Sequence, residues 1–146
     1  MPREKPKIAI FGGTGDLGSA LAKKWAKKGY DIIIGSRSKE KATRIARSMR
    51  KELDVKSIEG FESAEAAKLC DLGVITVPYI SHATTLTAVK KFMQGKILVD
   101  TTVPFQKEVT KVSLPKAGSA AIEAQNILGG GVTVIAALQN LSLIHI

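Results

Sequence analysis

The chain has 146 residues, of which 45% are hydrophobic and 24% charged, which is typical of one globular domain with a buried core. Its 22 lysines and arginines outnumber its 13 aspartates and glutamates, and the net charge of +9 attracts anions in general. The low aromatic content of 5% argues against nucleic acid as that anion, and the single cysteine excludes an intrachain disulfide and a cysteine-based metal cluster.

The first predicted element is a short buried strand over residues 7–11, which runs directly into a glycine-rich turn. The next seven residues read GGTGDLG, and Gly13, Gly15 and Gly18 take the three glycine positions of a dinucleotide-binding fingerprint. These glycines allow a tight turn, a close backbone approach to a pyrophosphate, and close packing of helix on strand. The following helix would direct its free N–H groups at the phosphate oxygens. We therefore predict dinucleotide binding rather than an ordinary strand, turn and helix.

The second predicted strand covers residues 31–35, and its end is where such a unit meets the adenosine ribose. NAD-specific sites usually place an acidic residue there, but this chain has Ser36 and Arg37. A hydroxyl and a guanidinium can donate hydrogen bonds to a 2′-phosphate, and Lys41 adds a cation one helical turn later. Asp31 lies at the wrong end of the strand to act as the ribose acid. The sequence thus favours NADP over NAD, the alternative being a solvated basic start to the second helix.

The remaining sequence continues the alternation of helices and strands. Gly129–Gly131 precede a strand rather than a helix, so we interpret them as a helix stop and not as a phosphate cradle. The loop over 101–116 is the part for which the sequence predicts least. In chain order we predict a helix over 39–52, a strand over 57–61, a small helix that Ser63 caps and that ends near Cys70, a strand over 72–77 stopped by Pro78, a helix over 82–93, a strand over 96–100, a helix over 119–128 and a strand over 132–137.

This alternation predicts an α/β fold of the Rossmann type: a doubly wound, mainly parallel sheet with helices on both faces. In such folds the ligand lies across the carboxyl ends of the strands. The residues expected on that rim are Thr14, Ser36, Val77, Pro78 and Val103.

Four segments of this chain also occur together in a known family. They are GGTGDLG after the first strand, GSRSKEKA after the second, CDLGVITVP around the fourth and VDTTVP after the fifth. In these segments the chain resembles the NADPH-dependent reductases of coenzyme F420, a deazaflavin. The resemblance covers nearly the whole chain, and the Gly-Ser-Arg-x-x-x-Lys element is the segment that best distinguishes this family from others. It implies an oxidoreductase that transfers a hydride between NADP(H) and F420, and a homodimer for the full-length protein.

The resemblance also implies which residues bind the cofactor. The turn after the first strand would hold the pyrophosphate, the Ser, Arg and Lys of the second segment the 2′-phosphate, and the two Val-Pro pairs would border the nicotinamide. Asp16 stands where some relatives carry Asn, so its backbone N–H is the expected donor rather than its side chain. The implied residues are Gly13, Thr14, Gly15, Asp16, Leu17, Ser36, Arg37, Lys41, Val77, Pro78 and Val103.

Hydride transfer between nicotinamide C4 and deazaflavin C5 needs no acid or base in the hydride step, so we expect no catalytic side chain, and we expect no metal ion. His82 lies near the nicotinamide end of the predicted sheet and could contact a substrate, but we interpret it as structural. Two alternatives stay open: an NADPH-dependent reductase of another acceptor, such as a ferric chelate or a small carbonyl compound, and a non-catalytic NADPH-sensing module. A short-chain dehydrogenase is disfavoured because no lysine follows Tyr30 or Tyr79 four residues on.

The two ends of the chain carry separate expectations. Residues 1–6 lack a hydrophobic signal core, and the apolar stretch 128–138 is too short to span a bilayer, so we expect a cytoplasmic protein that binds no membrane. Residues 141–146 resemble the translation of a common sequencing adapter. We therefore expect an NADP-binding domain over 1–140, a non-native tail over 141–146, and no copy of the family's C-terminal helical domain.

Overall fold

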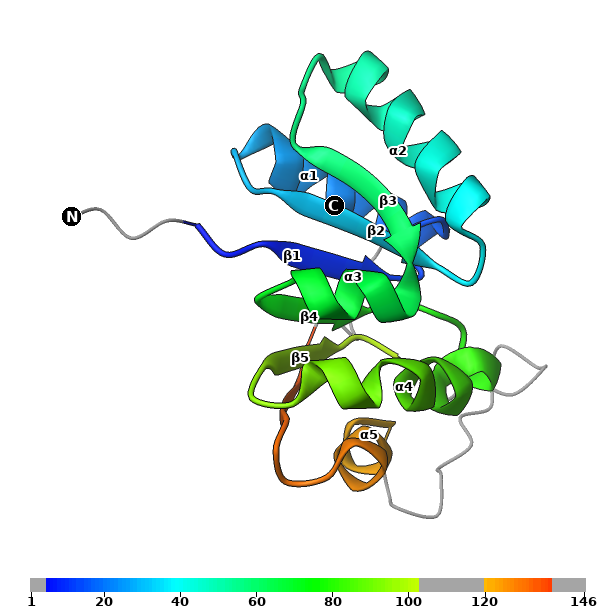
Figure 1. Ribbon diagram of the computed structural model, residues 1–146, viewed down its shortest axis with the longest axis vertical. Coiled ribbons are helices and arrows are strands. Elements are labelled where there is room, and N and C mark those ends of the chain that lie inside the picture. The colour runs from blue at the N-terminus through cyan, green and yellow to red at the C-terminus, as the bar shows by residue number, and fades with distance from the viewer. Residues whose placement is uncertain (1–4, 103–119, 138–146) are drawn as a thin grey trace.

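The computed structural model describes residues 5–102 and 120–137. Within this part, six parallel strands form one sheet in the order β3-β2-β1-β4-β5-β6, with helices on both faces (Figure 1). The predicted doubly wound α/β fold is therefore confirmed. In chain order the elements are β1 (Ile8–Phe11), α1 (Asp16–Lys27), β2 (Ile32–Ser36), α2 (Lys39–Leu53), β3 (Ile58–Glu62), α3 (Ser63–Leu69), β4 (Leu72–Ile75), α4 (Tyr79–Met93), β5 (Ile97–Asp100), α5 (Ala120–Leu128) and β6 (Thr133–Ala136).

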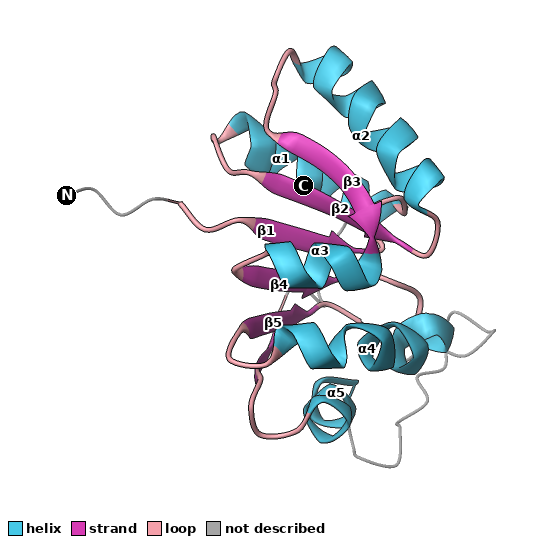
Figure 2. Cartoon of the chain, in the orientation of Figure 1, coloured by secondary structure: helices cyan, strands magenta, loops and turns pink. Residues whose placement is uncertain are grey.

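Strand β1 lies at the centre of the sheet, and all four of its residues are buried. Ile8 and Ile10 belong to the core under α1 and α2, whereas Ala9 and Phe11 belong to the core under α3, α4 and α5 (Figure 2). Such a continuous apolar run is typical of a parallel strand that is covered on both faces. The helices divide between the faces because right-handed connections from β1 to β2 and from β4 to β5 run toward opposite edges of the sheet.

The strand order reverses at β1, whose neighbours are β2 and β4. In open α/β sheets the crevice at such a switch point, beyond the carboxyl ends of the strands, is where ligands bind. The register aligns Phe11 of β1 with Gly35 of β2 and with Ile75 of β4. The segments that follow these three residues therefore begin side by side.

Two boundaries near this crevice differ from the prediction. Strand β4 ends at Ile75 and not at residue 77, because its neighbour β1 turns away from the sheet at Gly12. Helix α4 begins at Tyr79 rather than at His82. Pro78 does not stop the strand directly; it is the N-cap of α4, and its φ of −56° is compatible with a helix start.

Two further predictions concern helix ends. The prediction that Ser63 caps α3 was wrong: Glu62 is the N-cap, and no side chain caps this helix, since β3 runs into α3 without a loop. Gly129 has a φ of +81° and donates its N–H to the Gln125 carbonyl, which fits the predicted helix stop. Ser119 and most of the loop over 101–116 lie outside the described residues. No helix in the described ranges is long and apolar enough to cross a membrane.

Candidate functional site

The turn after β1 depends on a glycine that precedes the predicted fingerprint. Gly12 has a φ of +90°, and a Cβ there would lie 2.7 Å from Val77 Cγ1. Its N–H donates to the Gly35 carbonyl at 2.9 Å, which ties the turn to the end of β2. Positive φ values are costly for other residue types. This role of Gly12 was not predicted, although the Gly-Gly doublet is a signal for it.

The three fingerprint glycines meet different surroundings. A Cβ at Gly18 would lie 2.6 Å from the Gly12 carbonyl oxygen and 2.7 Å from Thr76 Oγ1, so only glycine lets α1 pack this closely on the turn. A Cβ at Gly13 would press on Ile34 at 3.0 Å. A Cβ at Gly15 would meet only the Gly12 oxygen, at 3.4 Å, so Gly15 faces open space where a ligand can approach the backbone.

Helix α1 begins at this turn without a side-chain cap. Gly15 is the N-cap, and no side chain of the described residues accepts a hydrogen bond from the first turn. Ser19 braces the turn from within the helix, since its Oγ donates to the Gly13 carbonyl at 3.0 Å. The N–H groups of Asp16 and Leu17 therefore lie at an uncapped N-terminus, which favours an anion.

Hydroxyl and cationic groups gather at the end of β2. Ser36 is half-buried, and its Oγ accepts the Ser38 N–H at 3.3 Å; Ser38 in turn caps α2 by accepting the Lys41 N–H at 3.2 Å. Arg37 and Lys41 are exposed, and neither forms an ion pair with any acidic residue in the described part of the chain. Two cations are thus free to pair with a ligand anion. We call Ser36, Arg37 and Lys41 the β2 wall.

A cleft of about 160 Å³ joins the turn to this wall and, across it, to the end of β4 and the start of α4. Pro78, Ser81 and Thr85 form its opposite side, which we call the α4 wall. The predicted residues that line the cleft are Thr14, Gly15, Ser36, Arg37, Lys41, Val77 and Pro78.

The other predicted residues lie elsewhere. Gly13 is buried under the turn, and Asp16 and Leu17 belong to the first turn of α1. Val103 lies outside the described residues.

Five cleft residues were not predicted. Ser63, 7% exposed, directly follows Glu62, whose partner in the sheet register is Ser36. The rule that carboxyl ends of neighbouring strands meet would have found it from the sequence. Thr76 braces the turn, since its Oγ1 donates to the Phe11 carbonyl at 3.1 Å. The full set is Gly12, Ser63, Thr76, Ser81 and Thr85.

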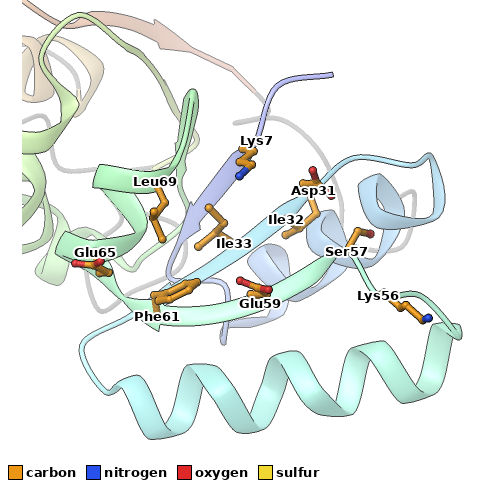
Figure 3. Close-up of a pocket in the computed structure, with 10 residues that line it drawn as sticks. All are labelled: Lys7, Asp31, Ile32, Ile33, Lys56, Ser57, Glu59, Phe61, Glu65 and Leu69. Atoms are coloured by element: carbon orange, nitrogen blue, oxygen red, sulfur yellow. The ribbon is translucent and has the colours of Figure 1, made fainter. Parts of the chain in front are cut away.

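Other cavities are larger but lack this chemistry. A cavity of about 520 Å³ lies between β2, β3 and α3, toward the amino ends of the strands. Figure 3 shows Ile33 and Phe61 at its base and Leu69 of α3 at its side, with the charged Lys56 and Glu59 nearby. None of its lining residues belongs to the glycine turn or to the β2 wall, so the volume of a cavity does not identify the site.

The one cysteine adds no reactive group to the cleft. Cys70 is 2% exposed, and its Sγ lies 3.9 Å from Met93 Sδ in the core. Burial raises the pKa of its thiol, which keeps the sulfur protonated and unreactive at neutral pH.

The donors in the cleft fit a nucleotide with a pyrophosphate and a further phosphate. The open backbone at Gly15 and the uncapped start of α1 suit the pyrophosphate. The hydroxyl and the two unpaired cations of the β2 wall suit a second anion. Both groups line one cleft, so one ligand can satisfy both.

Comparison with known proteins gives a consistent result. The family model described as NADP oxidoreductase, coenzyme F420-dependent, matches residues 7–104. The F420-dependent NADP reductase of Methanothermobacter marburgensis is 37% identical over 93% of this chain and 64% of its own length. That of Methanocaldococcus jannaschii is 39% identical over 92% of this chain and 63% of its own length. The chain thus spans less than two thirds of these relatives.

A solved structure supports the fold. A proposed F420-dependent NADP-reductase from Arthrobacter sp. FB24 superposes with a TM-score of 0.80 and covers 96% of this chain and 65% of its own. Its sequence identity of 24% makes this a likeness of fold alone.

Proposed function

The chain belongs to the family of coenzyme F420-dependent NADP oxidoreductases, and on that premise we propose that it is the NADP-binding part of an enzyme that transfers a hydride between NADP(H) and coenzyme F420. One observation carries the proposal. The unpaired cations Arg37 and Lys41 share a cleft with the glycine turn at the uncapped start of α1. A single ligand with a pyrophosphate and a 2′-phosphate satisfies both groups, and NADP is such a ligand.

In this proposal the glycine turn binds the pyrophosphate. Gly13 and Gly15 let the backbone approach the phosphates, and the N–H groups of Thr14, Asp16 and Leu17 donate to their oxygens. The Asp16 carboxylate is exposed and takes no part. Because these donors belong to a braced turn, they need no rearrangement on binding.

The β2 wall binds the 2′-phosphate. Arg37 offers two parallel N–H donors, Lys41 a second cation, and Ser36 a hydroxyl. NADH has no group for these cations, so the wall selects for NADPH. Arg37 contributes most to this selection because its fork matches the phosphate geometry.

Val77 and Pro78 border the nicotinamide half of the ligand, and Val103, which lies outside the described residues, is proposed on the same side. Bound NADP(H) would supply or accept the hydride, which would pass between nicotinamide C4 and deazaflavin C5. The apolar groups of this chain orient the nicotinamide ring and keep water from it. No side chain of the chain has to act as acid, base or metal ligand in that step, so we propose no catalytic residue.

The decisive experiment mixes the full-length protein with NADPH and oxidised F420 and follows the deazaflavin absorbance. We expect the oxidised band to disappear. If NADPH binds but the band persists, the protein is either a reductase of another acceptor, such as a ferric chelate or a small carbonyl compound, or an NADPH-sensing module. Consumption of NADPH with such an acceptor separates these two.

Further proposals concern the whole protein. We propose that residues 1–140 form the NADP-binding domain, that residues 141–146 are not native, and that the full-length protein continues into a helical domain and forms a homodimer. Residues 138–146 lie outside the described part of the chain. We also propose a cytoplasmic location, where a lone buried thiol is stable.

A further inference from the structure

Helix α4 is joined to the sheet by a buried polar pair that the proposed binding does not use. His82 and Asp100 are both 0% exposed, and the imidazole Nε2 lies 2.7 Å from the carboxylate Oδ2. Burying a carboxylate is costly unless it is well hydrogen-bonded. Asp100 meets that condition, because its Oδ1 also accepts the Thr102 N–H at 2.9 Å. Two apolar residues would fill this space at lower cost, so the pair calls for a reason beyond packing.

The pair acts at the point where α4 begins. Leu86, Val89 and Met93 follow His82 on the inward side of the helix and are buried among apolar neighbours. His82 is the inward residue of the first turn, and it reaches Asp100 at the very end of β5. No side chain caps the N-terminus of α4. The hydrogen bond to Asp100 therefore fixes a turn that local sequence leaves undefined.

A second contact holds the same turn from the outside. Tyr79 donates its hydroxyl to Glu123 Oε2 of α5 at 2.7 Å, and this hydrogen bond raises the pKa of the phenol. The Tyr79 and His82 rings lie 5.9 Å apart in a tilted contact. The first turn of α4 is thus tethered to β5 through a buried bond and to α5 through a partly buried one.

That turn carries the α4 wall of the cleft. Ser81 precedes His82 directly, Thr85 follows three residues later, and Pro78 is the N-cap. Ser81 and Thr85 lie four residues apart and so share one side of α4; both line the cleft, and His82 between them is fully buried against Asp100. A shift of His82 relative to Asp100 would move all three together.

We infer that His82 is a positioning residue, which through its hydrogen bond to Asp100 holds the α4 wall in place for the nicotinamide half of NADP. This inference rests on the proposed function. The β2 wall and the glycine turn lie on other elements, so their part of the ligand is independent of the pair.

The test compares two variants that differ only at residue 82. In Asp100→Asn the new amide can accept the Thr102 N–H and donate to His82 Nε2, which keeps the tether with the imidazole proton moved to Nδ1, an atom that is buried without a partner among the described residues. The double variant Asp100→Asn with His82→Leu removes the tether without leaving an unpaired buried carboxylate. Val89→Ala serves as control, because it removes packing from the same face of α4 but leaves the pair intact.

Each variant is titrated with NADP⁺ and with adenosine 2′,5′-bisphosphate, which lacks the nicotinamide half. We expect the double variant to bind NADP⁺ about tenfold more weakly than Asp100→Asn does, while both bind the bisphosphate equally. Val89→Ala should not change the ratio of the two affinities. Circular dichroism checks that each variant is folded. If the double variant is not, Asp100→Asn with His82→Gln replaces it. For that variant we expect a smaller fall in the ratio of NADP⁺ affinity to bisphosphate affinity.

Three results would overturn the inference. The first is that the double variant loses affinity equally for both ligands. The second is that Val89→Ala changes the ratio of the two affinities as much as the double variant does. The third is that the native chain binds NADP⁺ no more tightly than the bisphosphate. Failure of the native chain to bind either ligand would instead contradict the proposed function. The two failures are therefore distinguishable.

Discussion

The β2 wall and the α4 wall of the cleft hold their side chains by different means. In the β2 wall, Arg37 and Lys41 are exposed and unpaired, and local bonds through Ser38 shape the backbone beneath them. The α4 wall rests on contacts between distant parts of the chain, with His82 bonded to Asp100 inside the core.

The difference follows from what each wall is proposed to bind. A phosphate is recognised by charge, and charged side chains keep their strength only if no protein carboxylate neutralises them. A neutral ring is recognised by shape, which requires a wall that is fixed by tertiary packing. Residues that recognise a charge can thus be close neighbours in the sequence, whereas a wall that recognises a shape needs contacts between distant parts of the chain. Four predictions test this comparison.

The largest effect is expected where both walls meet the glycine turn. Gly18→Val forces a Cβ against the Gly12 carbonyl oxygen and Thr76 Oγ1, which lie 2.6 and 2.7 Å from its position. We expect a loss of about 3 kcal/mol in the free energy of unfolding, measured with urea, and loss of NADPH binding. Gly130→Val is the control, because a Cβ there meets nothing within 4 Å. Equal stability of the two variants would mean that α1 does not pack on the turn as described.

The second prediction isolates the β2 wall. Arg37→Ala should weaken NADPH binding by about 1.5 to 3 kcal/mol, or roughly ten- to a hundredfold, and leave NADH binding nearly unchanged. Calorimetric titration with both cofactors measures this. Arg47→Ala removes an exposed cation of α2 that does not line the cleft, and it controls for net charge. Equal losses for NADPH and NADH would refute the role of Arg37.

The third prediction, with a smaller effect, concerns how salt changes the preference for NADPH over NADH. Because Arg37 and Lys41 are exposed, salt should screen their attraction for the 2′-phosphate. The preference for NADPH over NADH should fall about threefold between about 0.05 and 0.5 M salt. NADH affinity, which uses neither cation, is the internal reference. A preference that does not depend on salt would indicate that ligand binding excludes solvent from the cations.

The smallest effect is expected at the outer tether of the α4 wall. Tyr79→Phe removes the bond to Glu123 and should lower the free energy of unfolding by about 0.5 kcal/mol at neutral pH. Since the folded pKa of Tyr79 is raised, the bond stabilises the fold below the usual tyrosine pKa of about 10 and is lost as pH rises further. Urea unfolding at pH 8 and pH 11 should therefore show a difference from the native chain only at pH 8. A difference that grows with pH would contradict this assignment.

The sequence predicted those parts of the site that depend on neighbouring residues. Gly15 and Gly18, Ser36, Arg37 and Lys41 could be found because each lies next to a strand end within a short motif. Ser63 and Thr76 were missed. Thr76 lies within the CDLGVITVP segment but was not singled out, and Ser63 reaches the cleft only because β3 lies beside β2. His82 was expected to be structural, and the structure adds that its partner is Asp100, 18 residues away.

The alternation of apolar strands and amphipathic helices was enough to determine the fold class, because a strand buried on both faces needs helices on each side. The sequence also determined the charge of the β2 wall, since no acidic residue stands where the ribose would be bound. Only the tertiary structure decided which residues face each other across the cleft and that a buried histidine and aspartate join α4 to β5. Such pairings depend on the sheet order and the packing of distant elements, and local propensity carries no information about either.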